Sequence, residues 1–215
     1  MKKLLIGLTT LALLGCSAKG VLVHKKVNYD PTSEARIRVF QLNGNDSVKA
    51  YSDVSCEQFE TGKKKVRSKN PFAKENMYIG LPKSTLKSAT IGIPLSEHSV
   101  KALDRKSHFD TDSFTEQVIS ANKPAIIRSG AFGYSEFESQ PDMRGEVKVT
   151  SHSFNCYIFA EFTPKAGKDY EAYYHYAGDY CTLQVNELEA ATSTENPQIK
   201  AKLGKAVTLK QCKNK

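Results

Sequence analysis

The 215-residue sequence lacks a hydrophobic run long enough to cross a lipid bilayer. A membrane-spanning helix needs about 20 consecutive apolar residues. The apolar stretch near the N-terminus, from Leu4 to Leu14, is too short for this and is interrupted by Thr9 and Thr10. We therefore expect no spanning helix, and the stretch requires another explanation.

The common catalytic motifs are also missing. Gly133-Tyr134-Ser135-Glu136-Phe137 lacks the second glycine that the nucleophile turn of Gly-x-Ser-x-Gly enzymes requires. The sequence has no His-Glu-x-x-His motif and no phosphate-binding loop, and its histidines occur singly, which is typical of surface residues. These are His24, His98, His108, His152 and His175. We therefore expect a protein without enzymatic activity or a bound cofactor, although carboxylates that converge for glycan cleavage are an open alternative.

Closely spaced cysteine pairs, the usual mark of a thiolate zinc site, do not occur, so no metal centre is expected. The five cysteines are Cys16, Cys56, Cys156, Cys181 and Cys212. Cys16 belongs to an N-terminal signal described below, which leaves an even number. In an oxidising compartment, the default for four such cysteines is two disulfides.

The N-terminus has the plan of a bacterial lipoprotein signal peptide. Lys2 and Lys3 precede the uncharged stretch, which ends in Leu13-Leu14-Gly15-Cys16. These four residues resemble a lipobox, and the resemblance implies that Cys16 receives a diacylglycerol and becomes residue one after residues 1–15 are removed. Leucines just before the cysteine do not suit an ordinary secretory cleavage site, which prefers small residues.

Lipidation at Cys16 implies a membrane anchor without a spanning helix. Each buried methylene of an acyl chain such as palmitate contributes about 0.8 kcal/mol, so two or three chains hold a protein on a bilayer. By resemblance to the lipoprotein sorting pattern, Ser17 rather than aspartate after the cysteine indicates the outer membrane. We expect the periplasmic face rather than the cell surface.

The mature chain is basic. Removal of Lys2 and Lys3 lowers the formal charge from +8 to +6. No nucleic-acid motif accompanies this charge, so we expect no nucleic-acid partner. Lipid headgroups, lipopolysaccharide or peptidoglycan are the natural anionic partners, and lysines that only keep the surface soluble are the simpler alternative.

The highest density of positive charge lies between Gly62 and Asn70. Five cations there are candidate anion contacts: Lys63, Lys64, Lys65, Arg67 and Lys69. Like charges packed this closely repel one another, which favours an exposed loop over a core element.

The sequence predicts one mainly β domain, an antiparallel β-sandwich with one or two short helices, stabilised by disulfides. We place this domain at residues 33–215 and a short tether at residues 16–32. The apolar triplet Val21-Leu22-Val23 suggests that the fold could instead begin at residue 21. In that case Lys25 and Lys26 would face the headgroups, each contributing about 1 kcal/mol near an anionic surface.

Alternation of apolar and polar residues marks the first clear strand, at residues 35–39. Asn43-Gly44 follows, a strong hairpin signal, and residues 47–51 are expected to return as the partner strand. Further strands are expected at residues 114–120 and 125–128. Ser96 is expected to cap a helix that runs to Arg105.

The C-terminal part shows the most regular alternation. Residues 154–163 form a strand pattern with one apolar face, and turns follow at residues 164–168 and 177–179. This predicts a three-stranded antiparallel meander, and Val207 to Cys212 is expected to complete a sheet.

In such a meander, Cys156 and Cys181 lie on strands separated by a third. Their α-carbons would be about 10 Å apart, beyond the ~7 Å that a disulfide bridges. Of the three possible connectivities, this disfavours the one with a direct Cys156–Cys181 bond. Two remain open, and of these we favour Cys56–Cys156 with Cys181–Cys212.

Tyrosines cluster in the middle and last strands of the predicted meander. They are Tyr170, Tyr173, Tyr174, Tyr176 and Tyr180. Tyrosine is enriched in contact surfaces because it buries a large area and keeps a polar tip. The cluster is a candidate aromatic contact surface for glycan or protein, and ordinary strand packing is the alternative.

Several segments together resemble a group of lipoproteins of Gram-negative bacteria for which no activity is established. The segments are the lipobox, Arg36-Ile37-Arg38-Val39-Phe40 with its Asn-Gly turn, Ile91-Gly92-Ile93-Pro94, and residues 162–171. The resemblance implies a small envelope β-sandwich and transfers no catalytic residue. The sequence thus predicts an outer-membrane lipoprotein with a non-enzymatic binding or structural role in the cell envelope. A cell-wall glycan hydrolase or periplasmic inhibitor is the alternative.

Overall fold

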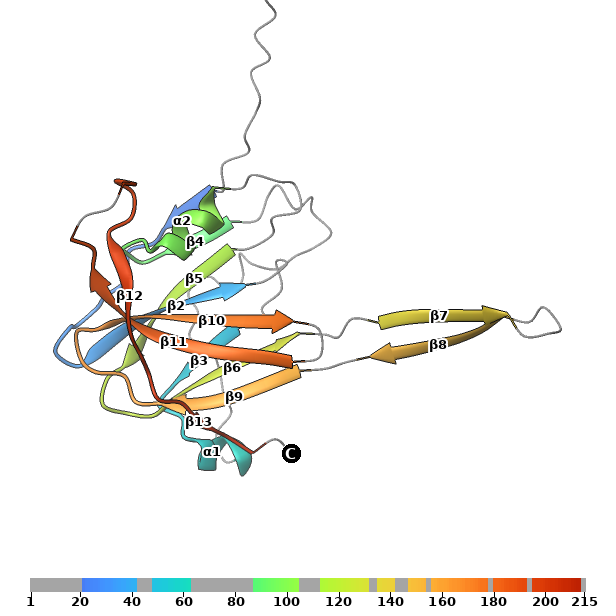
Figure 1. The fold of residues 1–215 in the computed structure, drawn as a ribbon. Coiled ribbons are helices and arrows are strands. Elements are labelled where there is room, and N and C mark those ends of the chain that lie inside the picture. Colours follow the sequence, from blue (N-terminus) through green and yellow to red (C-terminus); the bar gives the residue numbers. More distant parts are fainter. Residues whose placement is uncertain are drawn as a thin grey trace, which may run out of the picture.

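A computed structural model describes the fold for most of the chain. The described residues are 21–41, 48–62, 87–104, 113–131, 135–141, 147–153, 156–177, 180–192 and 195–213. The protein is mainly β, as predicted, with strands gathered into two packed sheets (Figure 1). Among the helices of these ranges, none combines the length and apolarity that crossing a bilayer requires.

The first sheet has five strands in the order β12-β11-β10-β2-β5. Their bounds are β12 Ala201–Ala206, β11 Tyr180–Ala190, β10 Asp169–Ala177, β2 Glu34–Gln41 and β5 Ser113–Ser120. The second sheet has four strands in the order β13-β9-β6-β3. These are β13 Lys210–Gln211, β9 Cys156–Phe162, β6 Ala125–Ala131 and β3 Val48–Ser52.

The main core lies between these two sheets. Ile37, Ala172 and Val185 from the first sheet belong to one buried cluster with Ile127 and Phe162 from the second. Each fully buried Val, Ile or Phe side chain stabilises the fold by about 1.5–3 kcal/mol relative to an exposed one. The shared cluster makes the two sheets one sandwich. The sandwich is not purely antiparallel, because β10 pairs with β2 in parallel.

The strands β2 and β3 occur where predicted, but the hairpin between them is wrong. β2 pairs with β5 and β10, whereas β3 pairs with β6 in the opposite sheet. Asn43-Gly44 lies outside the described residues. Both strands bury their apolar faces in the same core. Their alternating pattern therefore fits strands in two facing sheets as well as it fits neighbouring strands of one sheet.

The predicted three-stranded meander is also wrong, because its first strand lies in the other sheet. β9 pairs with β6 and β13, so the chain changes sheets between β9 and β10. The antiparallel pairing of the other two predicted strands is confirmed, since β10 and β11 pair with Tyr176 opposite Cys181. Residues 178–179 of the predicted turn between them lie outside the described residues. The predicted final strand is reduced to β13, and β12 was not predicted.

The change of sheet between β9 and β10 alters which cysteines can pair. The bonded pairs are Cys56–Cys212 and Cys156–Cys181, with α-carbons 5.1 and 6.2 Å apart. The predicted pairing is therefore wrong. Cys156 and Cys181 lie in facing sheets rather than on alternate strands of one sheet, so their disulfide ties the two layers together.

The helix α2, Glu97–Leu103, begins after Ser96 as predicted. Ser96 accepts a hydrogen bond from the backbone of Ser99, whose hydroxyl bonds to the Ser96 backbone in return. This capping box satisfies amide groups that a helix leaves unpaired at its start. A second short helix, α1, Cys56–Glu60, lies at a position that was not predicted and begins with a similar box at Ser55.

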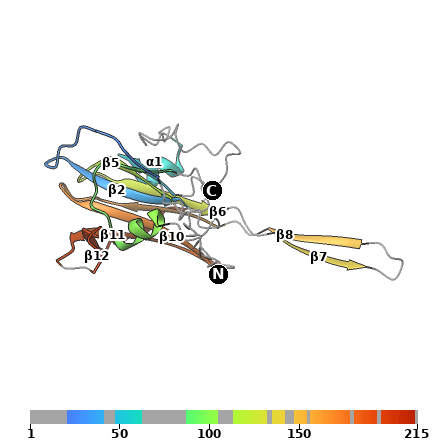
Figure 2. The ribbon, with the colours of Figure 1, turned by 90° about the horizontal axis from the view of Figure 1, so that it is seen from above.

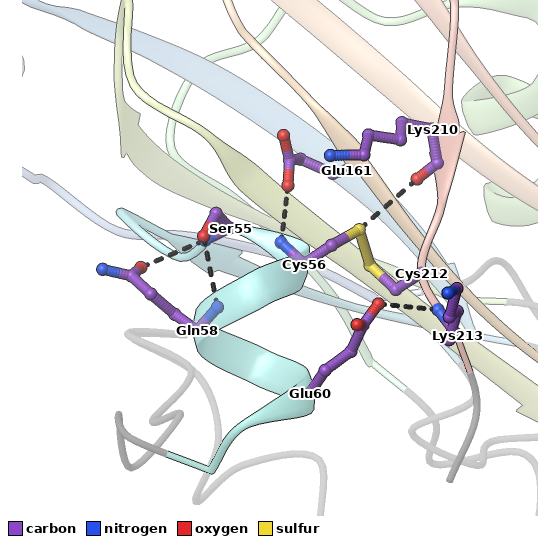
Figure 3. Close-up of a disulfide and its surroundings, with 8 residues drawn as sticks. All are labelled: Ser55, Cys56, Gln58, Glu60, Glu161, Lys210, Cys212 and Lys213. Atoms are coloured by element: carbon purple, nitrogen blue, oxygen red, sulfur yellow. Dashed lines mark hydrogen bonds between the residues drawn. A yellow bond between two sulfur atoms is a disulfide. The ribbon is translucent and has the colours of Figure 1, made fainter.

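The disulfide Cys56–Cys212 fixes α1 to the C-terminal strand (Figure 3). The Cys56 amide donates to the carboxylate of Glu161, and the Lys213 amide donates to Glu60. Cys56, Glu60 and Cys212 also lie close enough to share a metal ion. Cysteine binds metal as a thiolate, and here the two sulfur atoms are bonded to each other. The disulfide therefore acts as a covalent link between α1 and the C-terminal segment.

Two further strand pairs lie outside the main sheets. β1, Val21–His24, runs parallel to β4, Lys87–Thr90, so residues 21–24 belong to the fold. β7, Ser135–Pro141, and β8, Val147–Ser153, form an antiparallel ribbon. Figures 1 and 2 both show this ribbon projecting away from the sandwich.

Candidate binding site

Three charged side chains are buried on the outer face of the five-stranded sheet, the face that α2 covers. Arg38 on β2, Glu116 on β5 and Glu171 on β10 are at most 1% exposed. Arg38 is the register partner of both glutamates, one on each neighbouring strand. The sheet thus places one cation between two anions.

The hydrogen bonds of Arg38 and Glu116 hold residues 90–95 on the sheet. Arg38 Nε and Nη2 donate to Glu116 Oε1 at 3.0 and 2.7 Å, and Nη2 also donates to the carbonyl oxygens of Ile93 and Pro94. Glu116 Oε2 accepts from the Thr90 hydroxyl and from two backbone amides. A buried ion pair of this kind contributes only when its polar atoms are bonded, which is the case here.

Arg36 holds the same segment at its exposed edge. Its guanidinium forms two hydrogen bonds with the Asp169 carboxylate, at 2.7 and 2.8 Å, and a third with the carbonyl oxygen of Gly92. Gly92 has φ +102°, a conformation that side-chain-bearing residues rarely adopt. The turn at Gly92 therefore aims the neighbouring amides at Glu116.

Glu171 connects the buried cluster to α2. Its Oε2 accepts from Arg38 and from the Ser96 hydroxyl, and its Oε1 lies 2.9 Å from His98 Nδ1. Burial by itself would raise the pKa of Glu171, but the hydrogen bonds from His98 and Ser96 and the charge of Arg38 outweigh it, so the pKa is lowered. Glu171 is thus held as a carboxylate.

His98 is the member of this network that reaches solvent, with 39% of its side chain exposed. Its hydrogen bond to Glu171 raises its pKa by more than burial lowers it. The ring stacks on Tyr173 at 5.1 Å between centroids and meets Phe40 edge-on at 6.1 Å. No residue in the described ranges bonds to Nε2. His98 therefore presents one oriented, available ring nitrogen.

A cavity of about 270 Å³ lies beside His98, between the start of α2 and β12. The surface of its lining is mostly apolar, although charged residues also contribute to it. The lining residues are Glu97, His98, Ile199, Ala201, Lys202 and Leu203. Ala201 also packs with Ile93 and Leu188, so the apolar wall continues into a small cluster of its own.

Most buried polar side chains around the cavity are already engaged within the fold. The oxygens of Glu116 and Glu171 are engaged by neighbours within the fold. The Ser96 and Ser99 hydroxyls are buried in the helix cap, and the four cysteines of the described chain are in disulfides. Within the described ranges, the cavity wall therefore offers apolar area, one imidazole nitrogen and surface charges, without an activated nucleophile.

No family model, curated protein or solved structure matches this chain.

Two groups of predicted site residues lie outside the described ranges. They are the lipidation residue Cys16 and the cationic segment with Lys63, Lys64, Lys65, Arg67 and Lys69. The structure therefore leaves both as predictions.

The predicted tyrosine surface is divided between several environments. Tyr170 and Tyr174 are buried in the core between the sheets, at 2% and 0% exposure, and so cannot form a contact surface. Tyr173 packs on Phe40 and His98, and Tyr180 is 57% exposed. The Tyr176 side chain lies outside the description. The alternative of strand packing therefore holds for the two buried tyrosines.

Sequence reasoning missed Arg38, Glu116, Glu171 and His98. Alternation placed Arg38 on the solvent side of a half-buried strand, whereas that face is covered by residues 90–95 and α2. His98 was one of several isolated histidines. The available signal was Ser96 at a helix start, which positions His98 on the first turn, but the partner Glu171 lies 73 residues away.

Proposed function

We propose that this protein is an outer-membrane lipoprotein with a non-enzymatic binding role in the cell envelope. The observation that carries the binding role is the apolar cavity beside α2, which is lined by His98 in the orientation set by its hydrogen bond to Glu171. The lipobox at Leu13-Leu14-Gly15-Cys16 supports the anchor and the location.

The position of the first strand adds a geometric limit to this proposal. β1 begins at Val21, five residues after Cys16. A fully extended chain spans at most about 3.6 Å per residue, so Val21 lies within about 18 Å of the lipidated cysteine. A lipid at Cys16 would keep the domain close to the headgroups, and partners would have to be components within that reach.

The hydrolase alternative finds less support. Glycosidases need two carboxyl groups that flank the scissile bond and are free to donate or accept a proton. Glu116 and Glu171 are both buried and both contact Arg38, and their oxygens bond to groups of the fold, which favours a structural role.

Affinity capture from solubilised envelopes tests the proposal. Tagged full-length protein is expected to enrich a defined envelope component, and enrichment should fall when the cavity is altered by Leu203→Asp. Glu57→Gln, an exposed change on α1 in a different part of the fold, is the control. Turnover of purified peptidoglycan by the protein would contradict the proposal and favour the hydrolase.

Fractionation tests the anchor separately. Cys16→Ser should release an intact protein from the membrane fraction. Membrane association that persists in this variant would contradict lipid anchoring, whatever the result of affinity capture.

A further inference from the structure

β12 is an end strand of the five-stranded sheet and pairs with β11 on one side. The carbonyl oxygen of Leu95 accepts hydrogen bonds from the Lys200 and Ala201 amides, so the α2 loop covers the beginning of the other side. Along positions 202–206, no strand of the described chain pairs with that side. An open strand edge of this kind is a template for an added strand.

The hydrogen-bond direction along β12 follows from Ala201. Its amide bonds to Leu95 and therefore points away from β11. Residues 201–203 stay in continuous register with residues 190–188, and such amides alternate in direction along an antiparallel strand. The Leu203 backbone thus also faces the open side, where a second chain could bond to it.

The open edge is basic. Lys200, Lys202 and Lys205 are exposed and lie within six residues. Lys202 is 3.4 Å from Glu189, but both side chains are more than half exposed, so this pair is weak. Lys200 and Lys205 form no ion pair with any residue that the structure describes. Like charges disfavour a second copy of β12 at this edge and favour an acidic segment.

The cavity lies directly beside this edge. Leu203 is 40% exposed and lines the cavity together with Ala201. A volume of about 270 Å³ is below the ~300–1,000 Å³ that drug-sized ligands occupy. The cavity therefore suits a single apolar side chain that is presented by a longer chain.

We propose that β12 and the adjoining cavity bind an extended peptide segment in which apolar and acidic residues alternate. The segment adds to the sheet at positions 202–206, inserts an apolar side chain between His98 and Leu203, and directs carboxylates to Lys202 and Lys205. This inference rests on the proposed binding function and specifies the partner as an acidic extended segment of an envelope protein.

Fluorescence anisotropy with a defined probe tests this inference. The probe is a labelled decapeptide of alternating Asp and Leu, titrated with detergent-solubilised full-length protein. Saturable binding is expected, and the Lys202→Glu/Lys205→Glu variant should weaken it at least tenfold. Leu203→Ser should also weaken it. A decapeptide of alternating Lys and Leu should not bind.

Lys210→Glu/Lys213→Glu provides the matched control. It makes the same charge change at exposed residues at and beyond β13 in the other sheet, and should change the affinity less than twofold. Equal losses in the two double variants would show non-specific attraction and overturn the inference, as would absence of binding to the Asp-Leu probe. If that probe fails but affinity capture still enriches an envelope component through the cavity, the proposed function stands and this inference alone is wrong.

Discussion

Glu171 Oε1 lies 2.9 Å from His98 Nδ1 and joins the middle of the five-stranded sheet to α2. The same carboxylate contacts Arg38, so one side chain connects the buried ion cluster with the wall of the cavity. The geometry of the candidate site therefore depends on the stability of the cluster behind it.

Glu171→Gln should destabilise the protein strongly. The change leaves Arg38 with less compensation in a fully buried position, and removal of one partner from a buried ion pair typically costs about 3–5 kcal/mol. Denaturant unfolding followed by circular dichroism measures the difference. Glu189→Gln, which removes the exposed partner of Lys202, should cost less than about 1 kcal/mol. An equal decrease in the free energy of unfolding for the two variants would contradict the role of Glu171 in connecting Arg38 to α2.

The stability provided by His98 should decrease as the pH rises. The folded-state pKa of His98 is raised above 6.5 by Glu171, so the protonated ring stabilises the folded state. This contribution is fully present below the unfolded pKa and is lost as the pH rises through the folded pKa. The wild type should therefore lose its advantage over His98→Gln above pH 6.5, measured as the difference in melting temperature. A difference that grows with rising pH would contradict this assignment.

The loss of folding stability at low pH should involve a different group, Glu171. The pKa of Glu171 is lowered below 4.5, so its contribution is present above that value and is lost as the pH falls through the folded pKa. The His98 and Glu171 effects therefore occupy separate pH ranges and can be measured in one titration of stability.

Non-reducing peptide mapping should recover Cys56 linked to Cys212 and Cys156 linked to Cys181. The first pair spans 156 residues and the second 25. Under the chain-entropy model, the longer loop contributes about 5 kcal/mol and the shorter about 3.5 kcal/mol. Cys56→Ala/Cys212→Ala should therefore destabilise more than Cys156→Ala/Cys181→Ala in denaturant unfolding. The reverse order would show that native-state contacts, rather than loop length, dominate.

Removal of the β7–β8 ribbon should leave the sandwich intact. Ala131 and Cys156 are register partners at the end of the β6–β9 ladder, so residues 132–155 can be replaced by an Asn-Gly turn. β7 and β8 pair only with each other among the described strands. We expect the melting temperature to change by less than about 4 °C, the shift that 1 kcal/mol produces in a protein of this size. A collapse in stability would show that the ribbon supports the core.

Local features of the fold could be predicted from the sequence. Alternation located β2 and β9, and runs rich in β-branched residues located β5 and β6. Ser96 located the start of α2, because helix caps depend on neighbouring residues. Strand pairing could not be predicted in the same way. Alternation specifies which face of a strand is buried but not which sheet the strand joins, and this ambiguity produced the wrong hairpin, meander and disulfide pairs.

The candidate site was largely beyond the reach of sequence reasoning. Arg38 bonds to partners 78 and 133 residues away, and a lone arginine in an alternating strand is indistinguishable from a surface one. The cavity requires α2 and β12, which the sequence separates by about 100 residues. By contrast, the lipobox-like segment is contiguous, so the prediction of lipidation needs no knowledge of the fold.

Site-specific photo-crosslinking in intact cells tests the central claim most directly. A photoreactive phenylalanine analogue in place of Leu203, beside the cavity, should trap a defined envelope protein. The same analogue at Lys210, on the other sheet, should not trap it. The account predicts that the Leu203 product disappears when Lys202→Glu/Lys205→Glu is added. No product at position 203, or the same product from both positions, would contradict a binding role for this face.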